Sequence, residues 1–186
     1  MRSLPFVTTL VKLAGLALIM AAAPAQPQGP RHDGPRSGDW LDAHNEARAE
    51  AGIAPLVWSD RLARDAQDWA DHLAATGRYD HASPMQRQGQ GENLWRGPRG
   101  YWDTWDKVGF FVEEKRHFRP GQFPDVSATG RWNDVAHYTQ VIWPQTREVG
   151  CALAHTPDEE VLVCRYFPAG NIWGHRIDLA EHIARR

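Results

Sequence analysis

The two cysteines of the chain, Cys151 and Cys164, lie symmetrically about a turn-forming tetrapeptide at residues 156–159. The flanking segments, 148–155 and 160–167, show the alternating pattern typical of strands. In an antiparallel hairpin with this turn, Cys151 lies opposite Cys164. We therefore predict a structural disulfide, which in the chain-entropy model stabilises the fold by about 3 kcal/mol. A metal-binding or catalytic use of the two thiols is the alternative.

The N-terminus indicates the oxidising compartment that such a disulfide needs. Arg2 and Lys12 precede an apolar run at residues 13–23, and the Ala-Pro-Ala sequence at residues 23–25 has the pattern of a cleavage site. We expect residues 1–25 to be a signal peptide and the mature protein to be secreted, either to the extracellular space or to a periplasm. The apolar run is short for a membrane span, and an uncleaved anchor is the alternative.

The remainder of the chain suits one domain with short flanking segments. Residues 26–38 are rich in Pro, Gly and charge and are predicted to be a disordered linker. The domain is expected over residues 39–177, with a tail at residues 178–186. Without Arg2 and Lys12 the chain has 19 basic and 23 acidic residues, a formal charge of −4. Because phosphate binding needs a basic surface, no nucleic-acid partner is expected.

The hydrophobic periodicity predicts three helices before the hairpin. The first contains Trp40 and is stopped by Gly52, and the second has Ser59 as its N-cap and Gly77 as its C-terminal stop. The third is expected over residues 103–117. Its buried side is predicted to carry Trp105, Val108, Phe111 and Val112.

Two segments rich in Gly and Pro separate these elements and are predicted to be loops, at residues 78–102 and 119–132. A short helix through His137 is expected after the second loop. Helices early in the chain and strands late in it predict an α+β domain or a layered α-β-α domain.

No common catalytic motif occurs in the sequence, which lacks both a Gly-x-Ser-x-Gly elbow and a His-Glu-x-x-His zinc helix. Histidines and carboxylates beside the loops are the remaining candidates: His81, Glu92, Glu113, Glu114 and His137. Each of them has a structural explanation when taken singly, because a lone histidine is usually a hydrogen-bonded structural residue and a helix glutamate is usually solvated.

Eight sequence elements follow one another in a fixed order between residues 39 and 174. They are His44-Asn45-x-x-Arg48, Pro55-Leu56-x-Trp58, His81, Gly91-Glu92-Asn93-Leu94, the Glu113-Glu114 helix, His137-Tyr138-Thr139-Gln140-Val141-x-Trp143, Gly150-Cys151 and Cys164-x-Tyr166-x-Pro168-x-Gly170-Asn171. This order resembles the CAP or SCP superfamily of cysteine-rich secretory proteins, antigen-five allergens and plant pathogenesis-related proteins. The resemblance implies an α+β fold: a three-layer α-β-α sandwich with a central, mainly antiparallel sheet.

In that family a cleft is lined by two histidines and two glutamates. The matching motifs place His81, Glu92 and His137 there, and the spacing of the flanking aromatic residues favours Glu114 over Glu113 as the second glutamate. The resemblance implies a weak site for one divalent ion, with zinc the first choice, held by the two histidines and oriented by the carboxylates. The alternative is a purely structural cluster in which the glutamates fix the histidine tautomers.

Three functions remain open at this point. The resemblance implies an exported binding module for a lipid, a sterol or another hydrophobic ligand, with peripheral membrane contact compatible with it. Its site would be the loop at residues 119–132, where Phe123 and Trp132 are the candidate ligand-binding residues; an ordinary surface loop is the alternative. The second function is a metal-assisted hydrolase with Glu92 or Glu114 as general base. The third is a secreted envelope protein that presents its loops to a macromolecule. A binder is favoured over an enzyme, because the sequence shows neither a nucleophile nor a third strong metal ligand.

Overall fold

A central hairpin joins β4 (Glu148–His155) to β5 (Glu159–Phe167) in antiparallel register. Cys151 lies directly opposite Cys164, and the two residues form a disulfide. The predicted pairing is therefore confirmed. The computed structural model describes residues 37–179.

Three predicted segments fall largely outside the described residues. The signal peptide, residues 1–25, lies wholly outside them, and the predicted linker is described only from Ser37, where α1 (Ser37–Glu50) begins. The predicted tail is described only as far as residue 179. Between Ser37 and that residue, no helix is both long enough and apolar enough to cross a membrane.

The hairpin forms the centre of a four-stranded sheet with the order β1-β4-β5-β2. β2 (Gly91–Pro98) is antiparallel to β5, and the short β1 (Val57–Trp58) is parallel to β4. The sheet is thus mainly antiparallel, as predicted. A second, two-stranded sheet pairs β3 (Gly121–Gln122) with β6 (Arg176–Ile177). This pairing ties the segment at residues 119–132 to the end of the domain.

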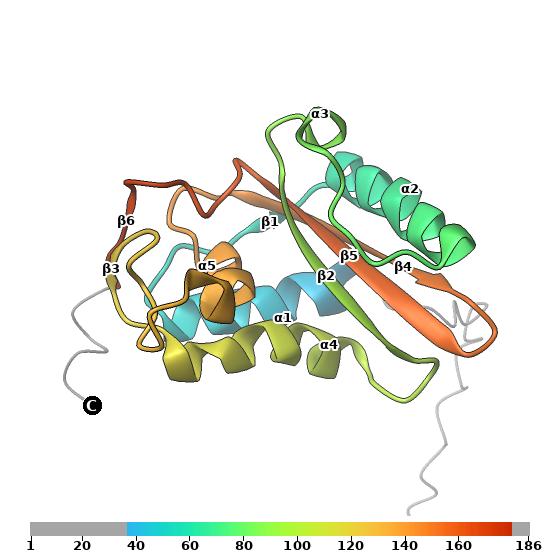
Figure 1. The fold of residues 1–186 in the computed structure, drawn as a ribbon, viewed down its shortest axis with the longest axis horizontal. Helices are drawn as coiled ribbons and strands as arrows, with labels where there is room; N and C mark the ends of the chain where they lie inside the picture. The colour runs from blue at the N-terminus through green and yellow to red at the C-terminus, as the bar shows by residue number, and fades with distance from the viewer. Residues whose placement is uncertain (1–36, 180–186) are drawn as a thin grey trace, which may run out of the picture. The chain divides into compact units, whose positions relative to one another are not determined.

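Helices cover both faces of the large sheet (Figure 1). α2 (Asp60–Thr76) packs along β4 and β5 on one face. The other face is covered by α1, α4 (Thr104–Val112) and α5 (Ala136–Val141). The predicted three-layer α-β-α sandwich and the predicted short helix through His137 are therefore confirmed. Three further short helices are α3 (Pro84–Arg87), η1 (Glu113–His117) and η2 (Trp132–Val135).

The alternation of side chains along β5 supplies two separate cores. Val161 and Val163 pack with α2, whereas Leu162 and Cys164 pack with the helices of the opposite layer. The period of two places Arg165 on the same face as Val161 and Val163. This arginine is only 2% exposed, which is unusual for a charged residue and requires a partner.

The first two helices are confirmed, with one correction. Gly52 and Gly77 follow α1 and α2 in the left-handed conformation, each with φ of 68°, as helix-terminating glycines do. Ser59 stands at the N-cap position of α2, but its side chain accepts no hydrogen bond there, so the prediction that it caps the helix is wrong. Its backbone is used instead, because its N–H donates to the carbonyl of Val149 and its carbonyl accepts from Ala63.

The prediction of a single loop over residues 78–102 is wrong, because this segment contains α3 and the edge strand β2. Gly89 and Gly100 adopt positive φ, of 80° and 70°, as turn glycines do, whereas Gly91 and Gly97 in β2 make room for side chains. A Cβ atom at Gly91 would lie 2.0 Å from Oε1 of Gln140, and one at Gly97 would lie 2.4 Å from the ring of Trp95. A high glycine content therefore concealed a strand.

The third helix, predicted over residues 103–117, is α-helical only through Val112 and continues as the 3-10 helix η1. Val112 itself is partly buried. Trp105 is 46% exposed, so the prediction that it is buried is wrong. The buried residues of α4 are Thr104, Lys107, Val108 and Phe111. These positions follow the i, i+3, i+4, i+7 stripe of a helix, from which Trp105 is displaced by one residue.

Candidate functional site

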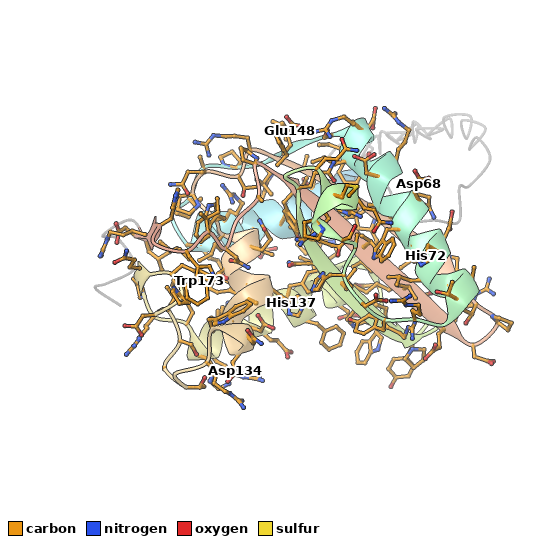
Figure 2. The ribbon with its side chains drawn as sticks, turned by 45° about the horizontal axis from the view of Figure 1, so that its top comes forward. Asp68, His72, Asp134, His137, Glu148 and Trp173 are labelled. Atoms are coloured by element: carbon orange, nitrogen blue, oxygen red, sulfur yellow. A yellow bond between two sulfur atoms is a disulfide. The ribbon has the colours of Figure 1, made fainter. Side chains whose placement is uncertain are left out.

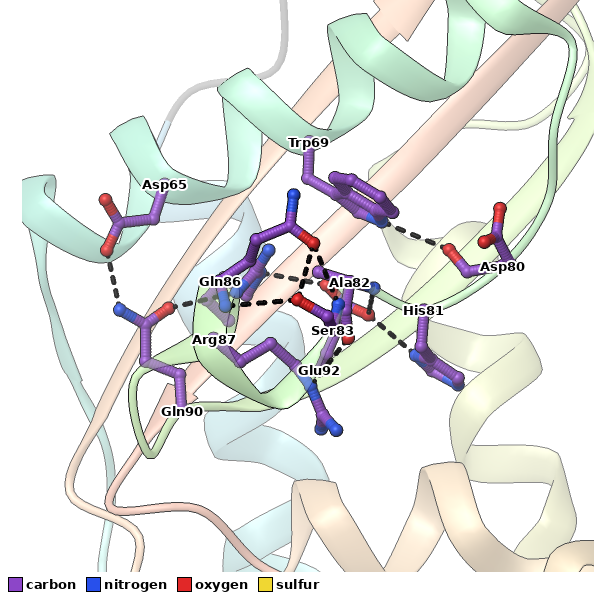
Figure 3. A network of polar contacts seen from close by, with 11 residues as sticks. Asp65, Trp69, Asp80, His81, Ala82, Ser83, Gln86, Arg87, Gln90 and Glu92 are labelled. Carbon is purple, nitrogen blue, oxygen red and sulfur yellow. Dashed lines mark hydrogen bonds and ion pairs between the residues drawn. The ribbon is translucent and has the colours of Figure 1, made fainter.

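His81 lies in the loop after α2, and Glu92 at the start of β2 holds its ring. Nδ1 of His81 is 2.7 Å from Oε1 of Glu92, and the same oxygen accepts the backbone N–H of Ala82 at 3.0 Å (Figure 3). The other oxygen of Glu92 lies 3.0 Å from Nε of Arg165. The Glu92 side chain has no exposed surface, whereas the His81 side chain is 54% exposed. The carboxylate therefore anchors the ring from inside the protein.

His137, at the start of α5, is held in a comparable way by Glu114 of η1. Its Nδ1 is 2.6 Å from Oε1 of Glu114, while Oε2 accepts the backbone N–H groups of His137 and Tyr138 at 2.9 and 3.1 Å. The ring also stacks on Phe111, with ring centroids 5.3 Å apart. Glu113 instead points to solvent and lies 4.0 Å from Arg116. Of the two adjacent glutamates, Glu114 is the one at the histidine.

These contacts assign the tautomer of both histidines. An ionised carboxylate only accepts hydrogen bonds, so the Nδ1 atoms of His81 and His137 carry the hydrogen. The Nε2 atom of each neutral ring is then left with a free lone pair. Such a nitrogen can bind a metal ion or accept a proton.

The two histidines line one cavity of about 300 Å³. Its wall comes from the loop after α2, from β2, from α5 and from the segment after β5. The lining residues are His81, Arg87, Gly91, Glu92, Asn93, Trp132, Ala136, His137, Gln140, Ala169, Gly170 and Asn171. The structure thus brings His81, Glu92 and His137 to the same cavity, with Glu114 behind His137. This lining contains no serine, threonine or cysteine side chain.

A family model described as "CAP: Cysteine-rich secretory protein family" matches residues 41–166, a range that includes His81, Glu92, Glu114 and His137. The chain belongs to the CAP family. Its CAP domain therefore accounts for the order of motifs seen in the sequence, and the family's description names secretory proteins.

Curated relatives extend over most of the chain. Pathogenesis-related protein 1A of Nicotiana tabacum is 37% identical over 137 residues, which are 73% of this chain and 77% of the relative. Pathogenesis-related protein PRMS of Zea mays is 33% identical and covers 88% of this chain and 95% of its own length. Golgi-associated plant pathogenesis-related protein 1 of Homo sapiens is 34% identical, covering 71% and 82%.

Solved structures show the same fold at lower sequence identity. The structure of NaASP2 with Zn2+ has a TM-score of 0.67 at 20% identity and covers 84% of this chain and 93% of its own. BmVAL-1 has a TM-score of 0.67 at 21% identity, covering 82% and 87%. These neighbours support the three-layer CAP architecture.

A different set of residues gathers potential ligand atoms in the core. His44, Cys151 and Cys164 bring three such atoms within 4.8 Å of one another, the only such group among residues 37–179. Both sulfurs belong to the disulfide, and a metal ligand must be a thiolate. Both ring nitrogens of His44 are also engaged, by the carbonyl of Trp40 at 2.7 Å and by the hydroxyl of Tyr166 at 2.8 Å. The oxidised CAP domain therefore holds no metal at this group.

The two predicted ligand-binding aromatics have different surroundings. Trp132 lines the cleft and is 37% exposed, so its ring can meet a ligand. Phe123 is 1% exposed and packs edge-on against Trp132 and Trp173, with centroids 5.6 and 6.4 Å away. A direct ligand contact of Phe123 stays a prediction; in the structure its ring supports the two tryptophans. Figure 2 shows Trp173 on the side of the domain where α5 carries His137.

Arg165, which lies behind Glu92, was not predicted from the sequence. Burial lowers the pKa of Arg165, and the nearby carboxylates of Glu92 and Asp65 oppose this shift. One signal was available in the sequence: an arginine between Cys164 and Tyr166, directly after the apolar run at residues 161–164. A charged residue in a buried strand indicates a buried partner. The sequence alone did not show that the partner would be Glu92.

Proposed function

We propose that this protein is an exported CAP-domain binding module whose cleft holds one divalent metal ion between His81 and His137. The observation that carries the proposal is that a carboxylate holds each of the two rings through the same nitrogen. Each Nδ1 is held by a carboxylate, so each Nε2 keeps a lone pair, and both rings line one cavity. Carboxylate–histidine–metal arrangements of this kind are the usual way in which proteins orient imidazole ligands.

Zinc is the first metal to test, because neutral imidazoles suit it and because the neighbouring structure of NaASP2 was determined with Zn2+. In the described part of the chain, no three His, Cys, Asp or Glu ligand atoms that include either cleft histidine lie within 4.8 Å of one another. Two protein ligands leave the other positions of a tetrahedral ion open to water or to a bound ligand. We therefore expect modest affinity and an open site.

Calorimetric titration of the mature chain, residues 26–186, with zinc tests this proposal. We expect one site in the wild type and a loss of affinity of at least about tenfold in His81→Ala and in His137→Ala. His72→Ala is the matched control, because His72 is exposed on α2 and stacks on Trp69 away from the cleft (Figure 2). Wild-type affinity in both cleft variants, or an equal loss in the control, contradicts the proposal.

The geometry favours holding an ion over hydrolysis. A general base must reach the proton that it removes. Glu92 has no exposed side-chain surface, and its oxygens face His81, Ala82 and Arg165. Both oxygens of Glu114 are occupied as well, by the ring of His137 and by two backbone N–H groups. Each carboxylate thus holds a histidine ring in place and is not free to remove a proton from a substrate.

A second candidate function, binding of a hydrophobic ligand, has its own observation. Trp132 and Trp173 pack against the buried ring of Phe123 and are 37% and 67% exposed. Ile172, which precedes Trp173 in the sequence, is 41% exposed. Trp132 continues this surface into the cleft. Such a rigid apolar surface can bind a sterol or acyl chain, or contact a membrane.

Titration with a fluorescent sterol and a fluorescent fatty acid tests the second function. We expect saturable binding that weakens by about fivefold or more when Trp132 and Trp173 are both replaced by serine. Trp105→Ser is the control, because Trp105 is similarly exposed but belongs to α4. The function is wrong if the wild type shows no saturable binding or if the control loses as much as the double variant.

A further inference from the structure

The two histidine–carboxylate pairs of the cleft are built differently. Glu114 contacts the ring of His137 and the backbone N–H groups of His137 and Tyr138. Glu92 contacts the ring of His81 and also faces a buried cation, Arg165. We infer that Arg165 is a positioning residue for His81, and that it fixes the tautomer that turns a lone pair on Nε2 toward the cleft. This inference rests on the proposed function, in which that nitrogen binds the metal ion.

The register of the sheet brings Arg165 to its partner. Glu92 in β2 lies directly opposite Arg165 in β5. Their side chains are 0% and 2% exposed, and Nε lies 3.0 Å from Oε2. Neither atom makes a hydrogen bond with another described residue, so the two attract each other by charge. A buried carboxylate without such a cation would be strongly unfavourable, so each residue determines where the other lies.

A relay of polar contacts continues from Arg165 to the outer helix layer. Nη1 of Arg165 donates to Oε1 of Gln90 at 3.3 Å, and Nε2 of Gln90 donates to Oδ2 of Asp65 at 2.6 Å. Gln90 is 3% exposed, while Asp65 lies on α2 at the protein surface. Figure 3 shows Asp65 reaching from α2 to Gln90, and Glu92 reaching to His81.

The donor and acceptor roles in this relay are determined by its two ends. Asp65 is an acceptor, so Gln90 must turn its NH₂ group toward it and its carbonyl oxygen toward Arg165. Arg165 has donors only, so the Glu92 oxygen that faces it acts as an acceptor. Glu92 then requires a donor from His81, which must be Nδ1–H. The sequence of donors and acceptors leaves His81 no other neutral tautomer.

If Arg165 only stabilised the fold, its removal would not change the tautomer of His81 in a folded variant. If Arg165 is removed, the buried carboxylate of Glu92 must find another partner, such as an entering water, and its hold on His81 weakens. The ring is then free to adopt the Nε2–H tautomer, which cannot bind a metal through that atom. His137 has no arginine in its support and should keep its tautomer.

Nitrogen-15 NMR of histidine-labelled mature protein, recorded without metal at a pH where the rings are neutral, measures both tautomers directly. We expect wild-type His81 and His137 to be in the Nδ1–H form. In Arg165→Met, His81 should populate the Nε2–H form and His137 should not. Arg165→Lys, which keeps a cation beside Glu92, should restore most of the wild-type signal. An unchanged His81 in folded Arg165→Met overturns the inference.

Lys107→Met is the matched control, since Lys107 forms a comparably buried ion pair with Glu160 and neither residue lines the cleft. It should leave the tautomer of His81 unchanged, and a shift equal to that of Arg165→Met contradicts a specific relay. If Arg165→Met does not fold, Gln90→Met decides the question, because it breaks the relay without leaving a charge unpaired. It should raise the Nε2–H fraction of His81, and no rise overturns the inference.

Zinc titration of the same variants separates this inference from the proposed function. We expect Arg165→Met to weaken zinc binding by about tenfold, the lower end for residues behind a ligand. A wild type that binds no zinc contradicts the proposed function, while the metal-free tautomers still decide the role of Arg165. A tautomer change with unaltered zinc affinity contradicts the link between the relay and the metal.

Discussion

Glu114 binds His137 through both the ring and the backbone. One carboxylate oxygen is 2.6 Å from Nδ1 of the ring, and the other accepts the backbone N–H of His137 and that of Tyr138. The same side chain therefore accepts hydrogen bonds from the first turn of α5 and orients the ring that lines the cleft. The position of His137 and the stability of this end of the domain are consequently linked.

Replacing Glu114 by alanine should destabilise the domain by about 2 kcal/mol, because two backbone N–H groups of α5 lose their acceptor. Glu113→Ala is the matched control, since Glu113 is exposed and makes only a 4.0 Å ion pair with Arg116. Its effect should stay within about 0.5 kcal/mol. Urea unfolding of both variants measures the difference. Equal effects at the two positions would show that Glu114 does not carry this link.

The buried ring of His44 should make stability depend on pH. Burial, with a smaller contribution from Arg48, lowers the pKa of His44 from 6.5 to about 4, and the hydrogen bond to Trp40 opposes this shift. Between these values the unfolded chain binds a proton that the folded domain does not, so stability falls as pH decreases. Above about pH 6.5 this contribution is constant.

His44→Gln removes this proton and isolates its effect from the carboxylates. Between about pH 7 and pH 5, the wild type should lose about 2 kcal/mol more unfolding free energy than the variant. Denaturant unfolding at several pH values measures the two slopes. Parallel pH profiles for wild type and variant would contradict a depressed pKa of His44.

Lys107 and Glu160 form a buried ion pair, with 2.9 Å between Nζ and Oε2 and side chains 4% and 6% exposed. Lys107→Met should cost about 3 kcal/mol, because it leaves a buried carboxylate without its cation. Adding Glu160→Leu should recover most of this loss. Lys115→Met is the control, since its pair with Glu50 is half-exposed and should contribute less than about 1 kcal/mol. A double variant no more stable than Lys107→Met contradicts this account of the pair.

The disulfide between Cys151 and Cys164 closes the hairpin at the centre of the sheet. Replacing both residues by alanine should lower the unfolding free energy by about 3 kcal/mol. Thermal unfolding with and without reductant provides the check, because reductant should destabilise the wild type and leave the variant unaffected. A variant as stable as the oxidised wild type would mean that the crosslink does not constrain the unfolded chain.

The sequence predicts those features that depend on local periodicity. The cysteines and the turn between them define the register of the β4–β5 hairpin, and the helical stripes locate α1 and α2. β2 was not predicted, because its glycines are typical of a loop. Gly91 and Gly97 are needed there to make room for Gln140 and Trp95, whose positions depend on the folded chain. Local composition resembles a loop there, although tertiary packing makes the segment a strand.

The candidate site was predictable to the same extent. Family motifs identified His81 and His137, since these residues lie within ordered sequence elements. The relay from Asp65 through Gln90 to Arg165 was not predictable, because its members are joined only by the register of β2 on β5 and by the packing of α2.

The proposed function depends on His81 and His137 sharing one divalent ion. Anomalous diffraction at the zinc edge, from crystals of the mature protein soaked with zinc, tests this most directly. We expect a single peak in the cleft, about 2.0–2.1 Å from Nε2 of each histidine. A cleft without a peak, or separate ions on the two rings, would contradict it.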